Sequence, residues 1–122
     1  MDVRESGEDY LETIYLLSKR LSGVHAVDIA NELNFAKPSI TKAIRILKER
    51  EYVTVDSLNH ILLTDKGLSK AKEIYERHQT ITAFWIMNGV SAENADKDAC
   101  RMEHDISEET FLRIKELVAK QK

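Results

Sequence analysis

Residues 37–50 read KPSITKAIRILKER, the pattern of an amphipathic helix with one basic face. Pro38 stands in the first turn, where a missing backbone N–H costs no hydrogen bond. Ile40, Ile44 and Leu47 recur at helical spacing and predict a buried face, which leaves the polar residues between them to solvent. The stretch carries five basic side chains against a single acidic one, and this surplus favours contact with phosphates.

Two helices are expected before this stretch and a hairpin after it. Apolar residues at helical spacing from Leu11 to Leu21 predict a first helix that ends at Gly23. Residues 27–33 predict a short second helix whose start lacks the usual Ser or Thr cap. Residues 52–64 are β-branched and aliphatic around a polar turn, which predicts a two-stranded hairpin. Because two strands alone are marginal in water, we expect this hairpin to pack on the helices.

Three helices, the third basic, followed by a hairpin form the element order of a winged helix-turn-helix domain. In that architecture the third helix enters the major groove and the hairpin lies along the DNA backbone. An ordinary solvated basic face is the alternative, but the wing together with the local charge surplus favours DNA binding. Residues near the start of the third helix would reach bases and phosphates, and the remaining cations would contact phosphates. The candidates are Lys37, Pro38, Ser39, Thr41, Lys42, Arg45 and Lys48.

The second half of the chain reads as three more helical segments. Thr64 is the expected N-cap of a long helix that ends at Gly89. Ser91 could cap the next segment, and Ser107, followed by two acids, is the expected cap of the last helix. Residues 91–110 carry seven acidic side chains against two basic ones, which favours cations as ligands.

Metal-capable side chains gather on three of these predicted helices. A thiol, a carboxylate and an imidazole at positions i, i+3 and i+4 of the CRMEH motif would share one helical face. Each residue alone has an ordinary interpretation, such as a small buried hydrophobe for Cys100. Together they fit a divalent transition-metal site with nitrogen, oxygen and sulfur ligands. The candidate ligands are Asp9, Glu12, His78, Cys100, Glu103 and His104.

The composition is that of an ordinary globular protein. The chain has 122 residues, 43% hydrophobic and 32% charged, with a formal net charge of -3, enough for one domain or two small modules. It has no apolar run near the roughly 18 residues that span a bilayer, and its acidic start does not read as a secretion signal. The single cysteine cannot form an internal disulfide. We therefore expect a cytoplasmic protein with a reduced thiol.

Five segments carry a resemblance to a known family. They are ESGEDYLETIY, PSITKAIRILKEREYV, LTDKG, RHQTITAFW and DACRMEHDISEETF, in this order. The sequence resembles the metal-dependent repressors typified by the diphtheria toxin repressor and the manganese transport regulator, over essentially the whole chain. The SH3-like third domain of longer members has no counterpart here, so the chain looks like the shorter manganese branch.

The resemblance implies a mainly α fold of two parts. Residues 1–72 would form the winged helix-turn-helix DNA-binding domain, and residues 73–122 a helical metal-binding and dimerisation domain. It implies a repressor of metal uptake genes that binds double-stranded operator DNA as a homodimer. A metal between the two parts would set the spacing of the two recognition helices. Neither an enzymatic activity, a membrane partner nor a small organic substrate is expected.

The resemblance also assigns the ligands. Glu103, His104 and His78 match ligand positions in both branches of the family. Asp9 and Glu12 match ligand positions of the manganese branch.

Cys100, by contrast, matches the iron branch. That branch has a second, ancillary metal site, and its glutamate and histidine ligands stand at the positions that Thr82 and Asp96 occupy in this chain. Asp96 could substitute weakly there. Carboxylates suit Mn²⁺ and a thiolate favours Fe²⁺, Co²⁺ or Zn²⁺. We expect Mn²⁺ to be slightly favoured over Fe²⁺, with Co²⁺ or Zn²⁺ able to bind in vitro.

Two other functions fit parts of the sequence. A metalloenzyme would use the same acids and histidines, but the chain has no glycine-rich phosphate loop, nucleophile–base pair or HExxH motif. A winged-helix regulator could instead respond to a non-metal or redox signal through Cys100. Acidic neighbours disfavour the thiolate, which makes this cysteine a poor peroxide target.

Overall fold

The computed structural model of the chain describes residues 7–121. The described residues contain six α-helices and one two-stranded antiparallel sheet, which confirms the mainly helical fold. They divide into two compact units, one ending at Lys72 and the other beginning at Glu73. The longest helix, α4 (Asp65–Met87), contributes residues to both units. Among the described helices, none combines the length and apolar character that crossing a membrane requires.

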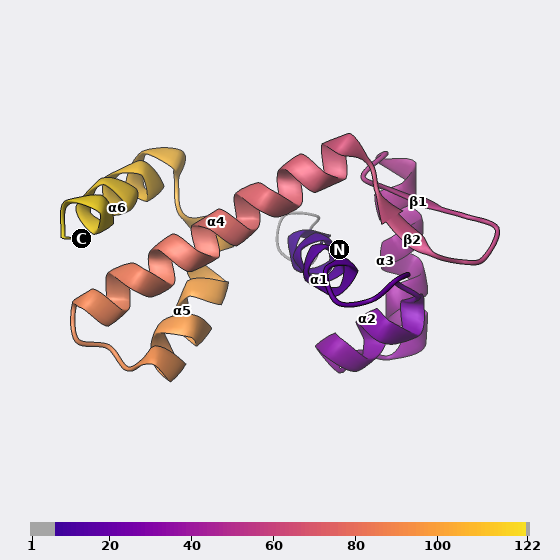
Figure 1. The fold of residues 1–122 in the computed structure, drawn as a ribbon, viewed down its shortest axis with the longest axis horizontal. Coiled ribbons are helices and arrows are strands. Elements are labelled where there is room, and N and C mark those ends of the chain that lie inside the picture. Colours follow the sequence, from indigo (N-terminus) through magenta and orange to yellow (C-terminus); the bar gives the residue numbers. More distant parts are fainter. Residues whose placement is uncertain (1–6, 122) are drawn as a thin grey trace. The chain divides into compact units, whose positions relative to one another are not determined.

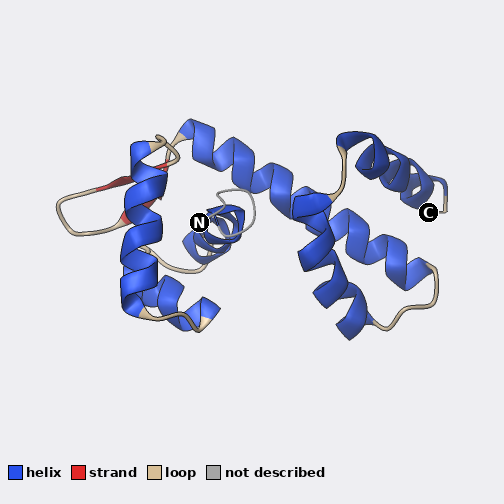
Figure 2. Cartoon of the chain, turned by 180° about the vertical axis from the view of Figure 1, so that it is seen from behind, coloured by secondary structure: helices blue, strands red, loops and turns tan. Residues whose placement is uncertain are grey.

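The first unit has the element order of a winged helix-turn-helix domain. Its three helices are followed by a short hairpin, drawn in Figure 1 and coloured by secondary structure in Figure 2. The strands pair antiparallel, with Val53 opposite Leu63. Before α4 the elements are α1 (Glu8–Ser18), α2 (Ala26–Leu33), α3 (Lys37–Glu49), β1 (Val53–Val55) and β2 (Ile61–Leu63).

The core of the first unit lies under α3 and the hairpin. Ile40 and Leu47 of α3 are fully buried, as their helical spacing predicts. Val53 and Ile61 bring one residue from each strand into the same apolar cluster, which confirms that the hairpin packs on the helices. Each such side chain stabilises the fold by about 1.5–3 kcal/mol relative to an exposed one.

The first helix is shorter than the sequence predicts. It ends at Ser18 rather than at Gly23, and Leu21, expected on its buried face, is 38% exposed. The chain turns away early, and the carbonyl of Val24 accepts a hydrogen bond from the N–H of Ile61 at 2.7 Å.

Gly23 has a different role from the predicted one. A Cβ on this residue would lie 2.5 Å from atoms of the His60 ring, so Gly23 permits close packing of two loops instead of ending a helix. Nothing in the local sequence indicates this approach, because His60 lies in the hairpin.

The second helix is capped from within. It begins at Ala26, and the Asp28 side chain accepts a hydrogen bond from the backbone N–H of His25 at 2.8 Å. Three residues after the cap, this carboxylate supplies half of a capping box, which explains how the helix starts without Ser or Thr. Asn34 ends the helix in the left-handed conformation, with φ of 57°.

The second unit consists of the C-terminal part of α4 with α5 (Ala92–Asp105) and α6 (Glu108–Lys120). Figure 1 shows α5 and α6 beside this part of α4. Ile81, Ala99 and Phe111, one from each helix, form a buried cluster that holds the three together.

The structure confirms the three expected N-caps. In each, a side-chain hydroxyl accepts the backbone N–H three residues further on. The pairs are Thr64 with Gly67 at 3.0 Å, Ser91 with Asn94 at 3.2 Å, and Ser107 with Thr110 at 3.1 Å.

Candidate metal centre and nucleic-acid interface

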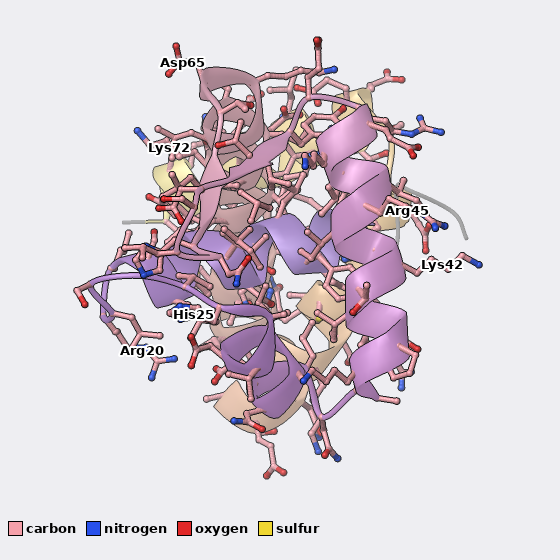
Figure 3. All side chains as sticks on the ribbon, turned by 90° about the vertical axis from the view of Figure 1, so that its right-hand side faces the viewer. Arg20, His25, Lys42, Arg45, Asp65 and Lys72 are labelled. Atoms are coloured by element: carbon pink, nitrogen blue, oxygen red, sulfur yellow. The ribbon has the colours of Figure 1, made fainter. Side chains whose placement is uncertain are left out.

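The seven candidates for DNA contact all lie on the exposed face of α3. Figure 3 shows the side chains of Lys42 and Arg45 reaching outward from this helix into solvent. On the opposite face Ile40, Ala43 and Leu47 are fully buried, so packing fixes which side of α3 is presented. The arrangement suits a helix that carries polar and cationic groups into a DNA groove.

The hairpin that follows α3 has a different character. Residues 53–63 contain neither Lys nor Arg, so the cations of α3 have no basic counterpart in the hairpin. In its loop, one oxygen of Asp56 accepts the backbone N–H groups of Leu58 and His60 at 2.9 and 2.8 Å. The hydrogen bond from His60 is the main reason that the pKa of Asp56 lies below its usual value. The loop is thus organised around one ionised carboxylate.

In the second unit, α4 and α5 bring His78 and Glu103 together. His78 Nδ1 lies 2.8 Å from Glu103 Oε2, and the other ring nitrogen, Nε2, lies 2.8 Å from an oxygen of Asp96. Glu103 is 2% exposed, whereas the Asp96 side chain is exposed. The imidazole is therefore held between one buried and one solvated carboxylate.

The second oxygen of Glu103 makes the strongest case for a metal ion. Oε1 is buried and has no hydrogen-bond partner among the described residues, although His104 Nε2 lies 3.4 Å away. A buried carboxylate oxygen without a donor is costly, and a bound ion or an ordered water would satisfy it. Carboxylate and imidazole groups are what divalent transition metals bind, so these residues fit a metal ion.

The remaining predicted ligands are placed individually. Cys100 is exposed on α5, so its interpretation as a small buried hydrophobe is wrong. Asp9 and Glu12 lie three residues apart on α1, each half-buried, in the first unit. The six-residue ligand set stays a prediction.

Two residues near the candidate centre were undervalued or missed by sequence reasoning. Asp96, expected at most as a weak substitute in an ancillary site, contacts His78 directly. Arg77 was not singled out at all, although it hydrogen-bonds the main chain of Glu103. Its hydrogen-bond partners lie 26, 29 and 31 residues away in the sequence, and the local signal is its position next to a candidate ligand.

Two family models together match nearly the whole chain. Residues 2–61 match the iron-dependent repressor N-terminal DNA-binding domain, and residues 64–122 match the iron-dependent repressor metal-binding and dimerisation domain. The chain belongs to the iron-dependent repressor family. This confirms the resemblance read from the sequence, and the family consists of transcriptional regulators, so the metalloenzyme alternative falls away.

Individual relatives and a solved structure are also similar to this chain. The chain is 34% identical over 113 residues to the HTH-type transcriptional regulator MntR of Geobacillus kaustophilus, covering 93% of this chain and 80% of that protein. It is also 34% identical over 113 residues to an HTH-type transcriptional regulator of Methanocaldococcus jannaschii, covering 91% and 90%. The solved structure of the manganese regulator SloR matches with a TM-score of 0.81 at 29% identity. That match covers 92% of this chain but only 53% of SloR.

Proposed function

We propose that this chain is a Mn²⁺- or Fe²⁺-responsive repressor that binds operator DNA as a homodimer and controls metal uptake genes. The observation that carries the proposal is the buried Glu103 carboxylate. One of its oxygens lies 2.8 Å from His78 Nδ1, and the other has no hydrogen-bond partner among the described residues. When bound, a divalent metal supplies the positive charge that this buried carboxylate lacks.

The proposed ligands come from both units. Glu103, His78 and His104 belong to the second unit. Nitrogens of the two histidines lie 2.8 and 3.4 Å from oxygens of the Glu103 carboxylate. The family resemblance adds the remaining three, which are Asp9, Glu12 and Cys100. Because deprotonated groups bind metals, the affinity for metal should fall as the solution is acidified.

The proposed metal is Mn²⁺ ahead of Fe²⁺. Three carboxylates in the set are hard oxygen donors of the kind that suits Mn²⁺. The exposed thiol of Cys100 acts in the other direction, because thiolates favour Fe²⁺, Co²⁺ or Zn²⁺. Whether this thiol binds the metal therefore decides the assignment.

The proposed DNA contact is the exposed face of α3, which enters the major groove. Pro38, Ser39 and Thr41, near its N-terminus, would meet bases and phosphates, together with Lys42. Lys37, Arg45 and Lys48 would contact phosphates and give salt-dependent affinity without reading sequence. In a homodimer two copies of α3 would reach half-sites one or more helical turns apart, so metal and operator should strengthen each other's binding equally.

Anaerobic titration of the reduced protein with Co²⁺, followed by absorption spectroscopy, tests the metal site. We expect visible cobalt bands in the wild type. A thiolate-to-cobalt charge-transfer band that disappears in Cys100→Ser would make Cys100 a ligand and favour iron. Cobalt bands without that feature would indicate oxygen and nitrogen ligands and favour manganese. An absence of bound cobalt would overturn the proposed metal site.

A matched control for the cobalt experiment is Asp98→Asn. Asp98 is an exposed acid on the same helix as Cys100 and lies outside the proposed set. Its variant should bind cobalt as the wild type does. A loss as large as that of a proposed ligand would indicate that the acidic surface as a whole attracts the ion.

DNA binding is tested with a labelled duplex selected from a random pool by the Mn²⁺-loaded protein. Fluorescence anisotropy should show tighter binding with Mn²⁺ than with chelator. In Lys48→Ala the slope of log affinity against log salt should decrease in magnitude by about one, the value for one lost phosphate contact. Equal affinity with and without metal would favour a regulator that responds to another signal.

A further inference from the structure

Arg77 lies on α4 and binds both helices that follow it. Its Nη1 donates hydrogen bonds to the backbone carbonyls of Glu103 and Ile106, each at 3.2 Å. Its Nη2 donates to the Glu108 carboxylate at 2.6 Å, and the guanidinium carbon lies 5.0 Å from the centre of the Phe111 ring. The Arg77 side chain is only 13% exposed, whereas its partner Glu108 is on the surface of the second unit.

The acceptors of Arg77 lie at a helix end. Glu103 is in the last turn of α5 and Ile106 is its C-cap residue. The last carbonyls of a helix lack partners within it and carry the negative end of its dipole, so a largely buried guanidinium is a favourable cap. Glu108 belongs to the first turn of α6. One side chain therefore joins the end of α5 and the start of α6 to α4.

Arg77 and its neighbour His78 act on the same residue. Arg77 binds the main chain of Glu103, and His78 Nδ1 contacts the carboxylate of Glu103 at 2.8 Å. Two consecutive residues of α4 thus fix both the backbone and the side chain of one candidate ligand. The separation between the two ligands is set by the protein before a metal binds, which lowers the cost of ordering them.

We propose that Arg77 is a positioning residue of the metal centre, one that fixes Glu103 against His78 through the carbonyl cap on α5. This inference rests on the proposed metal-responsive function. Arginine is required for the role because its planar guanidinium presents five donors in a rigid fork and stacks on an aromatic ring. Lysine keeps the charge, but its ammonium cannot reproduce the fork or the stacking on Phe111.

The test compares Arg77→Lys and Arg77→Gln with the wild type in Mn²⁺ titrations of the full chain. Substituting a residue that orients a metal ligand typically weakens metal binding by about 10- to 100-fold. We expect both variants to weaken Mn²⁺ binding within that range. A second measurement uses the metal-free protein, in which ¹⁵N chemical shifts report the hydrogen bonding of the His78 ring. The Nδ1 resonance should move toward that of a solvent-exposed imidazole in both variants.

Glu108→Gln and Arg113→Gln complete the design. Glu108→Gln removes only the charge of the residue that accepts from Arg77 Nη2, so it should weaken Mn²⁺ binding less than Arg77→Gln does. If Arg77→Gln fails to fold, Glu108→Gln provides the test in its place. Arg113 is an exposed residue of α6 paired with Glu116, and its variant should leave both measurements unchanged. This control shows whether a general loss of positive charge matters.

The outcomes separate the inference from the function on which it rests. Folded Arg77 variants with wild-type Mn²⁺ affinity and an unshifted His78 resonance would overturn the positioning role and leave the proposed function standing. Wild-type protein that binds no Mn²⁺ would overturn the proposed metal site instead. A lower thermal stability with neither measurement changed would show that Arg77 merely holds the helices together.

Discussion

The exposed face of α3 in the first unit differs from the α4–α5 region of the second unit in how its candidate functional residues are related to the residues that stabilise the fold. In α3 the candidate DNA contacts are exposed, and the residues that stabilise the fold are buried on the opposite face. In the second unit a candidate ligand, Glu103, is itself buried, and a structural cap, Arg77, binds it. The candidate functional residues are therefore separate from the stabilising residues in the first unit, whereas in the second unit a candidate ligand lies buried and hydrogen-bonded among them.

The separation in the first unit predicts the largest effect, at Ile40. Ile40→Ala should lower the free energy of unfolding by about 2–5 kcal/mol, because it removes a fully buried side chain and leaves a cavity. Lys42→Ala, two residues away on the exposed face, should change it by less than about 0.5 kcal/mol while weakening DNA binding. Urea unfolding measures both. Similar losses of stability in the two variants would contradict the separation.

The overlap in the second unit predicts a mixed result at Glu103. Glu103→Gln should weaken Mn²⁺ binding by more than about 100-fold, beyond the range for residues that only orient ligands. The metal-free variant should keep most of the wild-type stability, because the glutamine amide oxygen can keep the contact with His78 Nδ1 and the carboxylate oxygen that lacks a hydrogen-bond partner is removed. Mn²⁺ titration and thermal unfolding in chelator measure the two effects. A large loss of metal-free stability would show that the carboxylate is mainly structural.

The smallest effect is expected in the hairpin loop, at Asp56. Because hydrogen bonds from His60 and Leu58 lower the pKa of Asp56 in the folded state, its ionisation stabilises the fold above the unfolded pKa of about 3.9. That contribution should be lost as the pH falls through the lower folded pKa. The difference in unfolding free energy between the wild type and Asp56→Asn should therefore be larger at about pH 6 than at about pH 3.

Ser57→Ala is the control for this last measurement. Ser57 is the exposed neighbour of Asp56, and its side chain does not titrate. The difference between this variant and the wild type should be independent of pH. A pH-independent difference in Asp56→Asn would mean that the carboxylate acts through its hydrogen bonds alone.

Much of the fold follows from signals within a few residues. The buried face of α3 follows from apolar residues at helical spacing. The three N-caps follow from a Ser or Thr before each helix, whose hydroxyl accepts the backbone N–H of the residue three positions later. The hairpin follows from two β-branched stretches around a polar turn. The predicted end of the first helix was wrong: α1 ends at Ser18, and beyond it the chain makes a non-local hydrogen bond between Val24 and Ile61.

The candidate site divides in the same way. Sequence by itself determined the types of donor and their spacing on each helix, because residues three and four apart share a helical face. Only the tertiary structure decided that Cys100 is exposed, that Asp96 and Glu103 hold opposite nitrogens of His78, and that Arg77 caps α5. These contacts join residues 18 to 29 positions apart. The path of the chain through its turns sets such contacts, and no local pattern encodes that path.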